Sequence, residues 1–141
     1  MNFITNHPIK IFIGLLITVL LFHICIITKI IPYSIAWGGR LQNDAEMYVF
    51  ETISILINLL LLWTLLMKGN LVKFKFSEKT LNIILWIFFV IFVLNTIGNL
   101  FAKTLIEKQF SLLTAISAIL LWIILVKHKN GSGILLKKDE W

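Results

Sequence analysis

Four long apolar stretches, separated by short polar segments, make up most of this 141-residue chain. No Asp, Glu, Lys or Arg occurs in residues 11–28, 52–67, 80–102 or 109–126. A helix needs about 20 mostly apolar residues to cross the hydrocarbon core of a bilayer. The pattern therefore predicts four transmembrane helices, which we place over about 9–31, 45–67, 80–102 and 109–127.

Helix-breaking and polar residues define the connections between these helices. Pro32 cannot continue a helical hydrogen-bond ladder and is expected to end the first helix. Asn43 or Asp44 is suited to cap the second. Residues 1–129 leave no room for a separate soluble domain, so we expect one all-α integral membrane domain: four transmembrane helices in a single antiparallel bundle. Residues 130–141, which begin with Asn-Gly-Ser-Gly, predict a flexible cytoplasmic tail.

Composition and charge support a multi-pass membrane protein and suggest its orientation. Hydrophobic residues make up 59% of the chain and charged residues 14%, unlike a typical soluble domain. Nine lysines fall on the side of the two termini and the middle loop, against four basic residues on the other side. Because Lys and Arg are enriched in cytoplasmic loops, both termini are predicted to be cytoplasmic. The net charge of +6 then reflects topology, and we expect no nucleic-acid binding.

The sequence offers little evidence for a metal, a cofactor or a known catalytic motif. Cys25 is the single cysteine, so no disulfide forms within the chain. The three histidines lie at different levels of the predicted bundle, which argues against a histidine metal cluster. A mixed site of His23, Glu51 and Asp44 has only weak support, so no metal and no cofactor are expected. The Ile-, Lys- and Asn-rich composition and the small size favour a bacterial inner membrane.

Polar residues within the apolar stretches fall at similar predicted depths. At a rise of about 1.5 Å per residue, His23 lies about 12 Å below the outer end of its helix and Glu51 about 9 Å. Polar side chains in a membrane usually face the bundle interior or a watery cavity. We therefore predict an outward-facing polar pocket, with His23 and Glu51 as the candidate catalytic residues near its floor. The expected ligand-binding residues are Trp37, Arg40, Asp44, Glu46, Asn58, Asn95, Asn99, Lys103, Thr114 and Ser117.

Each of these residues also has a purely structural interpretation. Glu51 would sit among lipid headgroups if its helix began later. Independently, His23 would only hydrogen-bond a neighbouring helix. Asn58, Asn95 and Asn99 would hold helices together. Trp37 would anchor the chain at the interface.

Three functional hypotheses remain open at this point. The first is a pocket that binds or transports a small polar solute, an ion or proton, or a lipid headgroup; transport through four helices favours a homo-oligomer. The second is a membrane-embedded enzyme that acts on a lipid or lipophilic substrate by His/Glu acid–base chemistry. The third is a small structural subunit or partner-binding protein, in which the polar layer only fixes the register of the helices.

One short segment resembles a known family. Residues 40–46, Arg-Leu-Gln-Asn-Asp-Ala-Glu, are similar to the segment that opens the second helix in the membrane-associated glutathione transferase family. The resemblance would imply a four-helix trimer. It covers seven residues with altered spacing, and the arginine-rich third helix of that family is missing because Arg40 is the only arginine. We therefore do not assign the chain to that family.

Overall fold

The computed structural model describes residues 6–35, 37, 41–101 and 105–135, and gives only the backbone for residues 6, 105–107 and 127–135. Within these residues the chain is all-helical and contains no strand. Four of its helices are long and apolar enough to span a membrane. The elements are α1 (Asn6–Ile27), the short 3-10 helix η1 (Tyr33–Ile35), α2 (Asp44–Lys68), α3 (Glu78–Leu100) and α4 (Leu105–Leu135).

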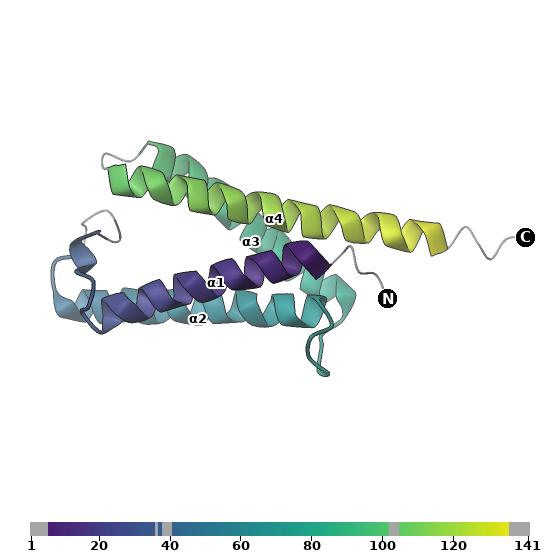
Figure 1. Cartoon of the computed structure of the whole chain (residues 1–141), viewed down its shortest axis with the longest axis horizontal. Helices are drawn as coiled ribbons and strands as arrows, with labels where there is room; N and C mark the ends of the chain where they lie inside the picture. Colours follow the sequence, from purple (N-terminus) through teal and green to yellow (C-terminus); the bar gives the residue numbers. More distant parts are fainter. Residues whose placement is uncertain (1–5, 36, 38–40, 102–104, 136–141) are drawn as a thin grey trace, which may run out of the picture.

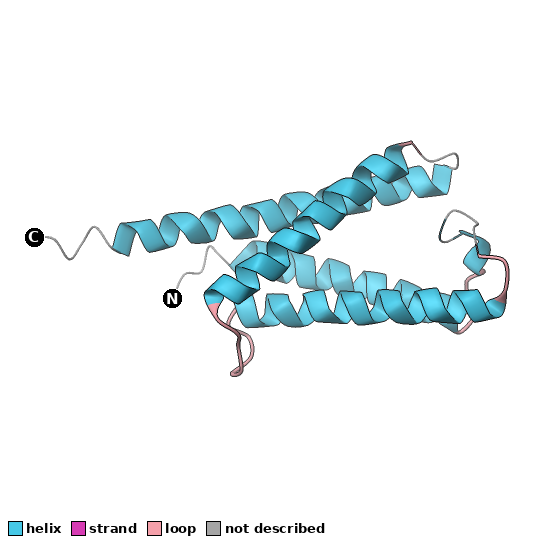
Figure 2. Cartoon of the chain, turned by 180° about the vertical axis from the view of Figure 1, so that it is seen from behind, coloured by secondary structure: helices cyan, strands magenta, loops and turns pink. Residues whose placement is uncertain are grey.

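The helices form two antiparallel hairpins. Helix α1 packs against α2, and α3 packs against α4, while α2–α3 and α1–α4 contacts join the hairpins. The hairpins lie close together near the two termini and diverge toward the α1–α2 and α3–α4 connections (Figure 1). The view from behind shows α3 leaving α2 at an angle (Figure 2). The molecule therefore has a packed end and a splayed end.

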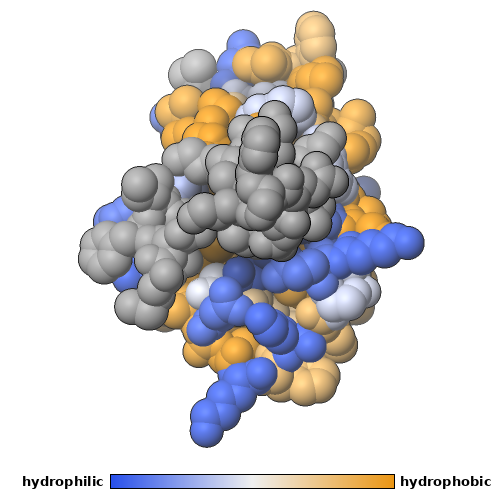
Figure 3. Space-filling view, turned by 90° about the vertical axis from the view of Figure 1, so that its right-hand side faces the viewer, coloured by the Kyte–Doolittle hydropathy of each residue, from blue (hydrophilic) through white to orange (hydrophobic). Residues whose placement is uncertain are grey.

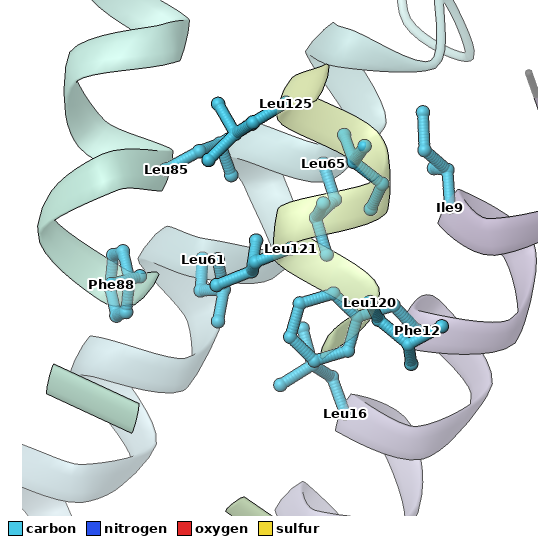
Figure 4. Close-up of a cluster of buried hydrophobic side chains, with 11 residues drawn as sticks. Ile9, Phe12, Leu16, Leu61, Leu65, Leu85, Phe88, Leu120, Leu121 and Leu125 are labelled. Atoms are coloured by element: carbon cyan, nitrogen blue, oxygen red, sulfur yellow. The ribbon is translucent and has the colours of Figure 1, made fainter. Parts of the chain in front are cut away.

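A single apolar cluster holds the packed end together. Its side chains come from the first half of α1, the second half of α2, the first half of α3 and the second half of α4, and they meet between the helices (Figure 4). Burial of each large aliphatic side chain contributes roughly 1.5–3 kcal/mol. The cluster consists of Ile9, Phe12, Leu16, Leu61, Leu65, Leu85, Phe88, Leu120, Leu121, Ile124 and Leu125.

The outer faces of the helices are also apolar. Ile17, Leu56, Ile87 and Ile119, one from each helix, are among the many exposed large hydrophobic residues. Soluble monomers rarely expose such continuous apolar surface. Hydrophilic residues instead project from the packed end (Figure 3), in agreement with the lysines of the α2–α3 connection.

Helix α1 begins and ends earlier than the sequence predicts. It runs from Asn6 to Ile27 rather than from about 9 to 31. Lys29 adopts a left-handed conformation with φ 60°, and the Ile31 N–H donates to the Cys25 carbonyl. The helix thus turns away before Pro32 is reached.

Helix α4 runs past its expected end. It continues to Leu135 instead of ending near 127, so half of the predicted tail (130–135) is helical. Two glycines there do not stop it, because each costs only about 1 kcal/mol relative to alanine. Residues 136–141 lie outside the described residues. Helices α2 and α3 lie within two residues of their expected bounds.

Candidate functional site

A carboxylate and an imidazole meet inside the α1–α2 hairpin. The Nδ1 atom of His23 lies 2.6 Å from Oε2 of Glu51. The Glu51 side chain is fully buried, and the His23 side chain is 16% exposed. A buried carboxylate is costly unless it is paired or hydrogen-bonded. The contact buries the Glu51 side chain within the hairpin, so it is not a solvated surface charge.

Trp37 supplies the second partner of the carboxylate. Its indole Nε1–H donates to Oε1 of Glu51 at 3.0 Å, and its ring packs on Phe50 with centroids 5.0 Å apart. The Trp37 backbone has φ 55°, which is rare for a bulky residue and costs of order 1–3 kcal/mol. Such strained residues cluster at functional sites. With Trp37 on Oε1 and His23 on Oε2, each Glu51 oxygen has a hydrogen-bond partner.

The second ring nitrogen of His23 remains available. Within the described part of the chain, Nε2 has no hydrogen-bond partner. With Nδ1–H donating to Glu51, Nε2 accepts a hydrogen bond; in the doubly protonated ring it donates one. The carboxylate thus orients the imidazole, and the free nitrogen is a group that can contact a ligand.

A cavity of about 560 Å³ lies between the two hairpins beside this pair. Its volume falls within the range of small-molecule sites, about 300–1,000 Å³. All four helices contribute to its walls. The lining residues are Leu15, Leu16, Thr18, Val19, Phe22, His23, Trp37, Glu51, Asn58, Phe92, Phe110, Leu113, Thr114 and Ser117.

The cavity is more apolar than the sequence predicts, because most of its polar side chains bond to backbone. The Asn58 amide donates to the Ser54 carbonyl at 2.8 Å. The Ser117 hydroxyl donates to the Leu113 carbonyl at 2.9 Å. Thr18 makes the same kind of bond to Gly14. Each of these side chains has a donor engaged by the backbone, whereas Nε2 of His23 has no partner within the described residues.

Aromatic contacts close two sides of the cavity. The rings of Phe22 on α1 and Phe110 on α4 lie 5.9 Å apart and close the α1–α4 side. The rings of Phe12 and Phe92 lie 6.1 Å apart, next to the apolar cluster at the packed end.

Thr114 also lines the cavity, and its hydroxyl is bound on two sides. It donates to the Phe110 carbonyl and accepts a 2.9 Å hydrogen bond from Thr96 of α3. The Thr96–Thr114 contact joins α3 to α4 within the second hairpin.

Two predicted site residues instead order the α1–α2 connection. Asp44 is exposed and pairs with Lys29, and this hydrogen bond raises the pKa of Lys29 above its usual value. Glu46 belongs to the helix cap: its N–H donates to Asn43 Oδ1 at 2.9 Å, and its carboxylate accepts from the Gln42 N–H. Neither lines the cavity.

Of the remaining predicted residues, the two that the structure describes are not gathered around the pair. Asn95 is exposed and Asn99 half-buried, and neither lines the cavity. Arg40 and Lys103 lie outside the described residues. His23 sits four residues before the end of α1, which reduces its depth below the helix end from the expected 12 Å to about 6 Å.

Sequence reasoning missed the apolar walls of the cavity. Phe22, Phe92, Phe110 and Leu113 line it, but an apolar residue on an inward face looks the same whether it packs in a core or borders a cavity. The signal that exists is their position, at the same level as the predicted polar layer.

The described residues contain no group of three or more His, Cys, Asp or Glu side chains that could hold a metal ion. Comparison of the chain with protein-family models, curated proteins and solved structures gives no match.

Proposed function

We propose that this chain is a multi-pass membrane protein that binds an amphipathic, lipid-like molecule in the cavity between its hairpins. The apolar body of the ligand would contact the cavity walls, and its head would hydrogen-bond to His23. The observation that carries the proposal is the combination of a 560 Å³ apolar cavity with one oriented imidazole at its edge. Sites for small molecules have this composition: mostly apolar walls and few polar groups.

The charge distribution supports an orientation for this site. The described lysines at the packed end include Lys10, Lys73, Lys75 and Lys79. By the positive-inside rule that end is cytoplasmic, and we place the cavity in the outer half of the membrane. A lipid diffusing in that leaflet would enter between the diverging hairpins. Among the places such a protein would reside, we favour the bacterial inner membrane.

A small polar solute or an ion fits the cavity less well. Most polar side chains of the lining already bond to backbone, as Asn58 and Ser117 do. At the packed end the fully buried Leu61, Leu65 and Leu121 fill the space between the helices. Binding from one leaflet therefore has more support than transport across the membrane by one copy.

Photolabelling of the purified full-length protein tests the proposal. The probe is a fatty alcohol that carries a diazirine on its chain. We expect labelled peptides from the lining of α1 and α4. Leu113→Trp, which fills the cavity, should reduce this labelling severalfold. The matched control is Leu112→Trp, because Leu112 is 66% exposed on the neighbouring position. Equal labelling of both variants would contradict the proposal.

An enzymatic function is the second candidate, favoured by the geometry of the His23–Glu51 pair. A carboxylate on Nδ1 that leaves Nε2 free is the arrangement by which enzymes orient a histidine base. Incubation with a total bacterial lipid extract, followed by mass spectrometry, tests it. A product formed by the wild-type protein and lost in both His23→Gln and Glu51→Gln would support catalysis. An unchanged lipid profile would contradict catalysis and leave binding as the proposed function.

A further inference from the structure

The inward face of α3 continues beyond the packed end into the cleft between the hairpins. Its residues repeat at intervals of four and three, the spacing that keeps side chains on one side of a helix. Leu81, Leu85 and Phe88 are buried in the packed end. The next residue, Phe92, lines the cavity. Asn95 and Asn99 follow in the same series, so they lie on the inward face of α3 at the splayed end.

The inward face of α2 has the same repeat. Its members are Glu51, Ser54, Asn58, Leu61, Leu65 and Lys68, and each is buried or half-buried. Lys68 fixes the register against α3, because its ammonium donates to Glu78 and to Asn82, each at 2.7 Å. The number of residues from Glu51 to Lys68 on α2 equals the number from Asn82 to Asn99 on α3. Antiparallel helices in this register bring Glu51 and Asn99 to one level.

The two amides on α3 have no partner at this level. Neither side chain is hydrogen-bonded within the described residues, and Asn95 is exposed. Each amide offers two donors and an acceptor. An unpaired amide within a membrane span is costly. The Phe22–Phe110 contact closes the α1–α4 side, whereas α3 diverges from α2 on the opposite side (Figure 2).

We infer that Asn95 and Asn99 form the second half of a head-group site whose first half is His23 and Glu51. This inference rests on the proposed function. The ligand head would be held between the two hairpins, with His23 Nε2 on one side and the amides of α3 on the other. Binding would draw α3 toward α2 and satisfy the amides.

The chemistry of these groups defines the class of head. Amides and an imidazole donate to and accept from oxygen atoms. The two ionisable groups of the first half-site, His23 and Glu51, already contact each other. The site therefore suits an uncharged head with several hydroxyl or carbonyl oxygens. A monoacylglycerol has such a head, whereas a fatty alcohol offers a single oxygen.

Competition against the photoreactive fatty alcohol tests this inference. Monoolein should compete more strongly than oleyl alcohol in the wild-type protein. Asn95→Leu with Asn99→Leu should weaken the competition by monoolein by about threefold to tenfold for each hydrogen bond lost. Competition by oleyl alcohol should change little. Thr96→Val is the matched control, because its hydroxyl lies on the same turn but contacts Thr114 of α4.

A distance measurement tests the closure independently. Spin labels at Ile53→Cys on α2 and Ile97→Cys on α3, in a Cys25→Ser background, occupy exposed positions. Saturating monoolein in nanodiscs should shorten the distance between the labels, and the double asparagine variant should abolish this change.

The outcomes separate the two proposals. If Leu113→Trp blocks labelling but the asparagine variants bind monoolein as the wild type does, the head-group inference is wrong and the cavity stands. If no cavity peptide is labelled in any variant, the binding function itself fails.

Discussion

Glu51 has two hydrogen-bond partners from different segments, and each serves one oxygen. In an apolar interior, a carboxylate oxygen that loses its donor retains the full cost of dehydration. The indole of Trp37 is the partner that can be removed with the least change in shape. Its hydrogen bond also links the α1–α2 connection, which contains η1, to α2.

Trp37→Phe keeps an aromatic ring next to Phe50 but removes the donor to Glu51. We expect the free energy of unfolding to fall by about 1–3 kcal/mol, as for hydrogen bonds to charged groups. Unfolding by SDS in mixed micelles, followed by circular dichroism, measures it. Trp63→Phe is the control, because Trp63 is exposed on the same hairpin, and it should stay within about 0.5 kcal/mol of the wild type. Equal losses in both variants would mean that the indole bond to Glu51 does not stabilise the protein.

The Lys29–Asp44 pair gives a prediction about pH. The hydrogen bond to Asp44 raises the pKa of Lys29, so the pair stabilises the folded state fully below the unfolded lysine pKa of about 10.4. Its contribution should be lost as the pH rises through the higher folded pKa. The stability difference between the wild type and Lys29→Gln should thus be constant from about pH 7 to 9 and vanish at more alkaline pH. A difference that grows with pH would contradict the assignment.

The residues of the site were predictable to different degrees. His23 and Glu51 stand out because charged or titratable groups are rare within apolar spans, and the structure places them in contact. Trp37 was also predicted as a site residue. Its hydrogen bond to Glu51 depends on a left-handed backbone conformation, which no local sequence pattern predicts. The apolar walls could not be distinguished from core residues by sequence. The roles of all these residues in binding stay predictions.

At the scale of elements, the end of α2 is joined to the start of α3 by a buried lysine. The Lys68 side chain is fully buried and contacts the half-exposed Glu78 as well as Asn82. The chain turns directly after it: Asn70 is left-handed, and the Leu71 N–H donates to the Leu66 carbonyl at 2.9 Å. This arrangement sets the register of the two hairpins.

Lys68→Met removes the ammonium while keeping an apolar stem of similar length. Asn82 then loses its partner, whereas Glu78 is exposed enough to be hydrated. We expect a loss of about 0.5–1.5 kcal/mol in the free energy of unfolding, because the half-buried Asn82 loses a hydrogen bond. Lys79→Met, at an exposed position of the same segment, should have little effect. The SDS unfolding assay compares the two variants.

Helix bounds were predictable where capping residues act locally. Asn43 caps α2 and Ser77 caps α3, each accepting from an N–H three residues on. The end of α1 was misplaced because Pro32 is the strongest breaker in sequence, but the left-handed turn at Lys29 precedes it. The end of α4 was misplaced because glycine lowers helix stability without forbidding the conformation.

At the scale of the molecule, four apolar helices that are long enough to span a membrane and expose apolar faces suggest a multi-pass membrane protein. The predicted orientation has a direct test. In a Cys25→Ser background, Gln42→Cys at the splayed end should react with a membrane-impermeant maleimide in intact bacterial cells. Ser77→Cys at the packed end should react only after permeabilisation. Both positions are exposed in the structure. The reverse pattern would invert the topology and place the cavity in the inner leaflet.

The position of the polar pair within the first hairpin has a consequence for biosynthesis. His23, Trp37 and Glu51 all belong to α1, α2 and the connection between them. The ribosome therefore synthesises all three residues before it makes α3 and α4. On insertion into a membrane, the carboxylate would leave the translocon already paired with its donors, and α1 and α2 would enter the lipid together. Helices α3 and α4 then pack against a hairpin whose buried carboxylate already has its hydrogen-bond partners, and they add the remaining walls of the cavity.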